Sequence, residues 1–469
     1  MSEAQRYDRQ LRLWGTHGQR KLSAGSVLCM GSGAVATEVL KSLVLPGIGW
    51  FVVADTAKVT ERDLGVNFFV EETDVGRPRA QVTAERLGEL NPSVRAEWET
   101  SIDIRGYFDV VVACNKMHVP PLVNFRYLVH VESIGFIGRI RLFAQAPHVV
   151  LEPKADEGRI DDLRIANPWP DLARFANSFD ISLEAEEIDV VHVPWLVLLA
   201  KAITVCKARQ MAVSRANIIS VLEQLRAGRD GLNFNEAAQN VYRVTALVQD
   251  TEVVHDLRNL IEKFCDFTDT LVCDLVDVLK AVIAFFYEKG VLPLQRMSLP
   301  DMTSRTDSYT ELVGLFRAQA EIDLSEVMSR CSRKFEKAHL SVIISNLRNL
   351  AVIELPKYES REGENVGESP VPKRHNSGDK MSEKTEYNVD EAKHADLCKV
   401  FDGHKDVSDE RILRELERYQ PDIEMHAVSS VIGSTAAQEI VKLVTNQFTP
   451  IDNSYVFNGI NGTAFTYHA

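Results

Sequence analysis

The chain has 469 residues, of which 45% are hydrophobic and 26% charged, so it is long enough to form two or three domains with sizeable buried cores. Its 67 acidic and 53 basic residues give a net charge of −14, which argues against a nucleic-acid-binding surface and leaves room for a basic protein partner. No apolar run reaches the roughly 18 residues of a membrane span, and the first residues lack the apolar core of a signal peptide. We therefore expect a cytoplasmic or nuclear protein with no membrane contact.

The seven cysteines occur at irregular spacings without any Cys-x-x-Cys pair, which argues against a disulfide framework and a cysteine-based metal site. We expect most of them to be small buried side chains. Cys206, Cys265 and Cys273 lie within apolar helical patterns, so we assign them to burial and not to nucleophilic catalysis.

Residues 5–14 combine charged and apolar side chains in a pattern typical of an amphipathic helix or an N-terminal arm. The next stretch consists of an apolar run at 27–30, a glycine-rich turn at 31–36, a helical segment and a second apolar run at 50–54. This order predicts the strand, turn, helix and strand of a nucleotide-binding fold.

Three residues of this unit are candidates for nucleotide binding. Gly31 permits the tight turn, Gly33 lets a pyrophosphate approach the backbone, and Asp55, after the second strand, is placed to hold a ribose. The pattern Gly-x-Gly-x-x-Ala is short and also suits a simple packing turn. It therefore predicts the fold more strongly than it predicts a bound nucleotide.

A helix is predicted at residues 79–90, where Asn91-Pro92 ends it. Further strands are predicted at 94–98, 109–113, 127–131 and 138–144. This alternation of strands and helices predicts a mostly parallel sheet covered on both faces, and we assign residues 1–150 to the domain.

Beyond this domain the apolar residues recur every three or four positions, which predicts a helical domain at residues 151–420. Helices are expected at 195–211, 215–226, 235–248, 252–264, 268–288, 309–319 and 324–350. Residues 357–396 are rich in charged, serine, glycine and proline residues, and we predict that this segment is flexible because it cannot bury enough apolar surface.

The C-terminal residues 421–469 are predicted to return to the first domain. A helix at 426–445 has small residues along one side, which suits close packing on a sheet, and we give His426 at its start no catalytic role. Two short apolar runs flank Asn461-Gly462, a strong hairpin signal. The expected fold is therefore α/β, with a Rossmann-like, mostly parallel sheet and a large inserted helical domain.

Several stretches together resemble the enzymes that adenylate ubiquitin and its relatives, whose ThiF-type fold is shared with bacterial sulfur-carrier adenylyltransferases. These stretches are Arg-Tyr-Asp-Arg-Gln at 6–10, the turn 31–33 with Glu38 and Lys41 in its helix, Asp55, and the segment 433–442. The sequence also lacks a Gly-x-Ser-x-Gly elbow, a His-Glu-x-x-His pair and a Walker motif, which disfavours hydrolases and P-loop enzymes. The resemblance implies adenylation, in which Mg²⁺ and cations offset triphosphate charge while a carboxylate attacks the α-phosphate.

Four positions depart from the pattern of active family members. The second acid of their Asp-x-Asp motif is replaced by Ala57, and a phosphate-binding arginine is replaced by Val66. Their downstream lysine corresponds to Arg79, which keeps the charge but not the compact ammonium group. Their metal-binding aspartate falls at or beside Asn115-Lys116, where a cation would repel Mg²⁺. Together these departures imply an adenylation site that no longer works, with a vestigial nucleotide turn.

An inactive adenylation domain with a long helical insertion resembles the noncatalytic subunit of a heterodimeric activating enzyme, and the length of the insertion favours the subunit that serves neddylation. In this family the arginine of Tyr-x-Arg-Gln reaches the partner's nucleotide site, which implies that Arg9 acts in trans. The implied partners are the catalytic subunit of the neddylation-activating enzyme and a ubiquitin-like modifier, with ATP and Mg²⁺ at that subunit's site. For this chain the resemblance implies no catalytic residue of its own, no metal and no firmly bound cofactor.

Three alternatives remain open at this point. One is the corresponding subunit of the SUMO-activating heterodimer, and another is an autonomous adenylating enzyme, which Ala57, Val66 and Lys116 disfavour. The third is a dinucleotide-dependent oxidoreductase, which the glycine-rich turn permits and the stretches 6–10 and 433–442 contradict.

Overall fold

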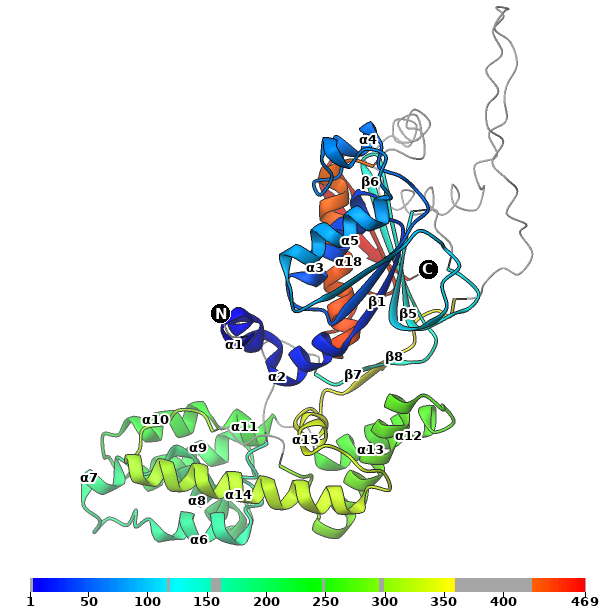
Figure 1. Ribbon diagram of the computed structural model, residues 1–469. Coiled ribbons are helices and arrows are strands. Elements are labelled where there is room, and N and C mark those ends of the chain that lie inside the picture. The colour runs from blue at the N-terminus through cyan, green and yellow to red at the C-terminus, as the bar shows by residue number, and fades with distance from the viewer. Residues whose placement is uncertain are drawn as a thin grey trace, which may run out of the picture.

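The computed structural model describes residues 3–115, 119–152, 162–246, 249–294, 299–358 and 424–468. Figure 1 shows a sheet domain, built around an eight-stranded sheet, and a helical domain that lies beside one end of it. Lys116 and the predicted flexible segment from residue 359 onwards lie outside the described residues.

The sheet has the strand order β10-β9-β6-β5-β4-β1-β2-β3. The five neighbouring strands from β5 to β3 pair in parallel, and β6, β9 and β10 extend the sheet by antiparallel pairing. The C-terminal hairpin therefore shares a sheet with the first strands, which confirms the predicted α/β fold with a helical insertion. The strands are β1 Ser26–Met30, β2 Trp50–Ala54, β3 Arg95–Glu99, β4 Gly106–Cys114, β5 Val123–Ile134, β6 Ile137–Ala144, β9 Ser454–Asn458 and β10 Thr463–Tyr467.

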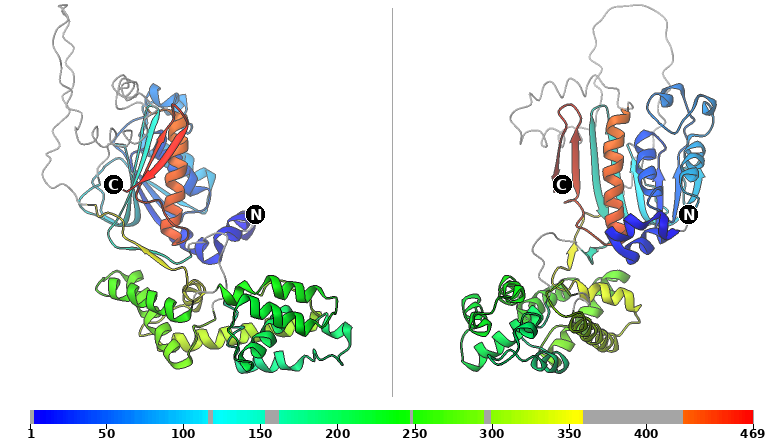
Figure 2. Two further views of the ribbon diagram at one scale, coloured as in Figure 1. Left: turned by 180° about the vertical axis from the view of Figure 1, so that it is seen from behind. Right: turned by 90° about the vertical axis from the view of Figure 1, so that its left-hand side faces the viewer.

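Three helices cover one face of the sheet: α3 Ala34–Val44, α5 Arg79–Leu90 and α18 His426–Thr445 (Figure 2, right). Alternate strand residues face them, so that the odd-numbered residues 27 and 29 of β1 pack on the helices while residues 28 and 30 face the other side.

In the part of the chain that the structure describes, helices cover only one face of the sheet, so the prediction that both faces are covered is wrong there. After β3 the chain crosses to the far side of β1 to form β4, and only residues 100–105 make this connection. Such a stretch is too short for a crossover helix. Its Ile104 packs on the second face, together with Val119 and Tyr358.

The helices α3 and α18 approach closely at Gly433. A Cβ atom at this position would lie 2.7 Å from the Cβ atom of Glu38 and 2.9 Å from the backbone nitrogen of Val39. The small side chains predicted along α18 therefore set the distance between the two helices, as expected for close packing.

Gly433→Ala is expected to lower the free energy of unfolding by roughly 1–3 kcal/mol, because the added methyl group overpacks this contact. Gly314→Ala is the matched control: it lies inside α14 Thr306–Arg330, and a Cβ atom there meets nothing within 4 Å. The control should raise the free energy of unfolding by about 0.5–1 kcal/mol through helix propensity. Urea denaturation measures both values, and a Gly433→Ala protein as stable as the wild type would contradict the close approach.

The helical domain is built from α6 Pro170–Ser178, α7 Glu187–Val190, α8 Trp195–Ala208, α9 Arg215–Arg226, α10 Leu232–Gln239, α11 Tyr242–Thr245, α12 Asp250–Phe264, α13 Thr270–Lys289, α14 and α15 Lys337–Ser345. The helices predicted at 195–211, 215–226, 252–264 and 268–288 are confirmed to within a few residues. The predicted helix 235–248 is instead divided between α10 and α11, with residues 247–248 outside the described part.

Two further details of the helical domain differ from the predictions. The predicted break between residues 319 and 324 is absent, because α14 runs through it, and the predicted helix 324–350 is instead divided between the end of α14 and α15. The buried Asp323 of α14 pairs with Arg164 at 2.5 Å. Cys265 is exposed after the last turn of α12, so its expected burial is wrong. Cys206 is buried, and Cys273 is only partly buried.

A two-stranded sheet that we did not predict, β7 His148–Val150 with β8 Ala351–Ile353, lies between the sheet domain and the helical domain (Figure 1). His148 is fully buried, and its Nδ1 atom lies 2.8 Å from the hydroxyl of Tyr127. Burial, together with the neighbouring cations Arg126 and Lys21, lowers the pKa of His148 to about 3.

This histidine predicts a loss of stability in acid. Because the folded-state pKa of His148 lies below its ordinary value of 6.5, the unfolded chain takes up the proton first as the pH falls. The contribution of His148 to the free energy of unfolding is fully present above about pH 6.5 and declines as the pH falls toward 3. At pH 4 the loss reaches up to about 3 kcal/mol. Urea denaturation between pH 7 and pH 4 should therefore show a flatter profile for His148→Gln, whereas the exposed control His255→Gln should keep the wild-type slope. Equal slopes for the two variants would refute the assignment.

Candidate functional site

The glycine-rich turn lies at the carboxyl end of β1, where the strand order reverses. Strand β1 pairs in parallel with β2 on one side and with β4 on the other, and ligands of open α/β sheets bind at such a switch point. Gly31 has a φ of +102°, a conformation that favours glycine, and Gly33 is the N-cap residue of α3. The structure thus brings both predicted glycines to the expected turn.

Asp55 follows β2 and is buried, with 5% of its surface exposed. Its Oδ2 atom accepts hydrogen bonds from the backbone N–H of Ser32 (3.0 Å), the Ser32 hydroxyl (2.5 Å) and Nη2 of Arg79 (2.9 Å), and its Oδ1 atom accepts one from the N–H of Ala57 (2.8 Å). Burial alone would raise the pKa of this carboxyl, but the charge of Arg79 and these hydrogen bonds hold the pKa below its ordinary value. Asp55 is therefore an ionised group whose lone pairs are used within the chain.

Arg79 neutralises two buried carboxylates at this site. Its Nε atom donates to the hydroxyl of Ser32 at 3.0 Å, and its Nη1 and Nη2 atoms donate to Asp63 and Asp55 at 2.9 Å each. Asp63 is 7% exposed, and its Oδ2 atom also accepts hydrogen bonds from the N–H and hydroxyl of Thr60 at 2.8 Å. A lysine ammonium carries its three donors on one atom and lacks this planar fork, so Arg79 has a definite structural role here.

Glu424, which the sequence analysis did not single out, lies at the N-terminus of α3. Its carboxylate accepts hydrogen bonds from the N–H groups of Ala34 (2.6 Å) and Val35 (3.2 Å) and from Nδ2 of Asn115 (3.0 Å). The acid and the N–H groups that a nucleotide would need thus already have partners within the chain. Because 390 residues separate Glu424 from Ala34, no local pattern could have revealed the contact.

The N-terminal arm consists of α1 Glu3–Arg6 and α2 Asp8–Ala24, with Tyr7 between them. Tyr7 is buried, and its hydroxyl accepts a hydrogen bond from Nδ2 of Asn91 at 2.9 Å, while Arg6 also bonds to Asn91. Arg9, in contrast, is exposed and has no hydrogen bond or ion pair with any residue in the described ranges. The arm is therefore anchored at Tyr7 with Arg9 directed to its surface.

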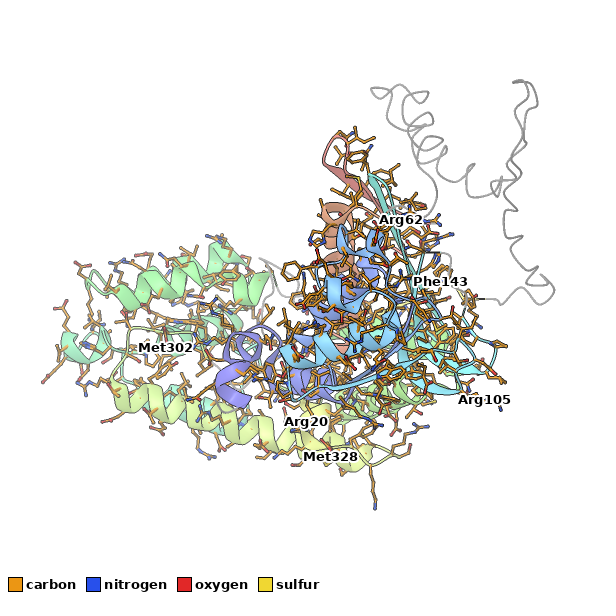
Figure 3. The ribbon with its side chains drawn as sticks, turned by 45° about the horizontal axis from the view of Figure 1, so that its top comes forward. Arg20, Arg62, Arg105, Phe143, Met302 and Met328 are labelled. Atoms are coloured by element: carbon orange, nitrogen blue, oxygen red, sulfur yellow. The ribbon has the colours of Figure 1, made fainter. Side chains whose placement is uncertain are left out.

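The arm lies far from the chain's own glycine-rich turn. Tyr7 packs against Gly47 and Asn91, in loops that precede β2 and β3, at the amino ends of the parallel strands. Asp55 lies at their carboxyl ends, and a strand of five residues such as β1 spans roughly 16 Å. Figure 3 labels Arg62 of α4 Glu61–Leu64 at one end of the sheet domain and Arg20 of α2 at the other. The structure does not bring Arg9 to this chain's own turn.

The described residues contain no group of three or more histidine, cysteine, aspartate or glutamate side chains arranged to hold a metal ion. Within the same ranges, no helix is both long enough and apolar enough to cross a bilayer. Neither finding changes the set of residues that form the site at the glycine-rich turn.

Comparison with known proteins gives one family model and many full-length relatives. Residues 7–118 match the model of the ThiF family. The NEDD8-activating enzyme E1 regulatory subunit of Caenorhabditis elegans is 28% identical over 98% of this chain and 98% of its own length. The regulatory subunit AXR1 of Arabidopsis thaliana is 28% identical over 97% and 94%, and that of Drosophila melanogaster is 28% identical over 99% and 97%.

Solved structures similar to this chain include Escherichia coli MccB with AMPCPP and MccA, at a TM-score of 0.27 and 16% identity over 31% of this chain and 51% of that one. The tRNA threonylcarbamoyladenosine dehydratase TcdA of Escherichia coli with ATP has a TM-score of 0.22 and 22% identity over 24% and 50%. The sequence relatives, in contrast, extend over both domains and both ends of the chain. The chain is therefore a full-length homologue of the NEDD8-activating enzyme E1 regulatory subunits, with a ThiF-family domain in its first part.

Proposed function

We propose that this chain is the regulatory subunit of a heterodimeric enzyme that activates a ubiquitin-like modifier for neddylation, and that its own adenylation site is inactive. The observation that carries the proposal is the pairing of Asp55 with Arg79 and Ser32. The acid that would hold a ribose is buried and fully engaged, and the second acid of the family motif is Ala57. The turn keeps the fold of a nucleotide site without the free charges that ATP and Mg²⁺ need.

In the proposed heterodimer, ATP and Mg²⁺ bind to the catalytic subunit, and Arg9 of this chain completes that site. The support is the geometry of the arm. Arg9 is exposed and lies near the amino ends of the parallel strands, whereas this chain's own turn lies at their carboxyl ends. A guanidinium supplied in trans can stabilise the charge of a triphosphate, as arginine fingers do. The sheet domain pairs with the related domain of the partner in a pseudo-symmetric dimer. We place the complex in the cytoplasm or the nucleus.

ATP–pyrophosphate exchange tests this proposal. The purified chain with the modifier and ATP should give only background exchange, and addition of the catalytic subunit should give robust, modifier-dependent exchange. Robust exchange by the chain alone would overturn the proposal and favour an autonomous adenylating enzyme. Exchange that depends on the SUMO modifier and its catalytic subunit would favour the SUMO-activating heterodimer, and stoichiometric NAD binding with hydride transfer would favour an oxidoreductase.

A further inference from the structure

We propose that Glu424 is a built-in anion that occupies the phosphate position of the glycine-rich turn and so keeps nucleotides out of this chain's own site. The inference rests on the proposed function in one respect, because it explains how a turn with the backbone of a nucleotide site stays inactive. The mechanism is competition, because the carboxylate of Glu424 and a phosphate group would use the same N–H donors.

The first turn of α3 requires an acceptor from elsewhere in the chain. Its N-cap residue is Gly33, which has no side chain to cap the helix, and no acidic residue lies in the first turn. The first N–H groups of a helix lack partners within the helix and carry partial positive charge, so they favour an anion. In the structure that anion is Glu424, whose two carboxylate oxygens accept one hydrogen bond each from Ala34 and Val35. A phosphate group at a helix N-terminus uses the same donors.

The glycine that would admit a pyrophosphate admits Glu424 instead. A Cβ atom at Gly33 would lie 2.5 Å from Oε2 of Glu424, so no other residue fits at this position while the carboxylate is in place. A phosphate group and the Glu424 carboxylate cannot share this space. The Glu424 carboxylate therefore both accepts the hydrogen bonds of these N–H groups and blocks the space that a phosphate group would occupy.

Asn115 provides a second, independent indication that the site is built around a carboxylate. This residue follows β4, at or beside the position where the family resemblance implies a metal-binding aspartate, and its Nδ2 atom donates to Glu424 at 3.0 Å. Its Oδ1 atom accepts the backbone N–H of Ser133 at 2.9 Å, which orients the amide. An aspartate here would place two carboxylates face to face, whereas the amide offers a donor.

The residues that follow Glu424 hold it over the turn. Met425 packs against the core of the sheet domain, and Nδ1 of His426 lies 3.2 Å from the carbonyl oxygen of Val66. Val66 is the position where active relatives carry a phosphate-binding arginine, according to the family resemblance. The start of α18 therefore lies across two parts of the nucleotide site at once.

Titration calorimetry with inorganic pyrophosphate tests the inference on the purified full-length chain. Glu424→Ala should bind pyrophosphate roughly 10- to 100-fold more tightly than the wild type, because the freed N–H groups can donate hydrogen bonds to a phosphate oxygen. Glu424→Gln, which keeps the size of the side chain, should show a smaller gain in affinity for pyrophosphate. It replaces the alanine variant in the test if that variant does not fold. Glu89→Gln removes the same charge from an exposed position on α5 and should bind pyrophosphate as the wild type does.

A double-mutant cycle in urea tests the same contact without a ligand. Asn115→Asp keeps the acceptor for Ser133 but turns the donor toward Glu424 into a carboxylate, so it should lower the urea midpoint. In the Glu424→Ala background this decrease should largely disappear, because the repelling partner is gone. Equal pyrophosphate affinities of the Glu424 variants and Glu89→Gln, or an unchanged effect of Asn115→Asp, would overturn the inference. Exchange activity of the wild-type chain alone would instead overturn the proposed function, so the two failures are distinguishable.

Discussion

Arg9→Ala in the reconstituted heterodimer is expected to slow modifier-dependent ATP–pyrophosphate exchange by roughly 10²- to 10³-fold, the cost of removing one donor from a charged transition state. The physical reason is that the guanidinium is exposed on an anchored arm, with no ion pair among the described residues, and so is available to another subunit. Assembly should be unaffected, because Tyr7 and Arg6 hold the arm through Asn91. Exchange rates and size-exclusion chromatography measure the two effects separately.

Arg12→Ala is the matched control for this experiment. Arg12 lies on the same helix, its side chain is 79% exposed, and it pairs with Asp8 at 2.9 Å. Loss of such a surface pair costs at most about 1 kcal/mol of stability, and we expect exchange within two-fold of the wild type, roughly 0.4 kcal/mol. Arg9→Lys should recover only part of the rate, since an ammonium lacks the planar fork of donors. If Arg9→Ala and Arg12→Ala give the same rate, the role in trans is wrong.

Arg79→Ala is expected to lower the free energy of unfolding of this chain by about 3–5 kcal/mol at pH 7, the range for removing one partner of a buried ion pair. Asp55 and Asp63 would both lose a cation at 2.9 Å while remaining almost inaccessible to water. Urea denaturation measures the loss. Arg12→Ala again provides the control, with a change of no more than about 1 kcal/mol.

The pH dependence of Arg79→Ala separates a charge effect from a packing effect. In the wild type the pKa of Asp55 is lowered, so its contribution to stability is present above the ordinary value near 3.8 and is lost as the pH falls below it. Without Arg79, only the hydrogen bonds from Ser32 and Ala57 oppose the effect of burial, so the pKa of Asp55 should rise, which lets the folded variant take up a proton at mildly acidic pH. The deficit of Arg79→Ala should therefore be smaller at pH 5 than at pH 7. A deficit that does not change with pH would indicate lost packing instead.

The sequence by itself determined the strands of the eight-stranded sheet, most of the helices and the glycine-rich turn, because these features depend on residues close together in the chain. The apolar run 27–30 became β1, the segment 426–445 became α18 with the same bounds, and the pair Asn461-Gly462 lies between β9 and β10. Periodicity and turn residues act over a few positions, so they can be read before the fold is known. The same limitation explains the missed one-sided cover of the sheet, which depends on how the short connection 100–105 crosses β1.

Only the tertiary structure decided how the charges of the site are used. Asp55 was correctly placed at the end of β2, but its pairing with Arg79 joins residues 24 positions apart, and the contact of Glu424 with Ala34 joins residues 390 positions apart. Whether a buried acid binds a ligand or neutralises another part of the chain depends on which groups the fold brings within hydrogen-bond distance. The position of Arg9 near the amino ends of the parallel strands is likewise set by where Tyr7 packs, which only the folded chain establishes.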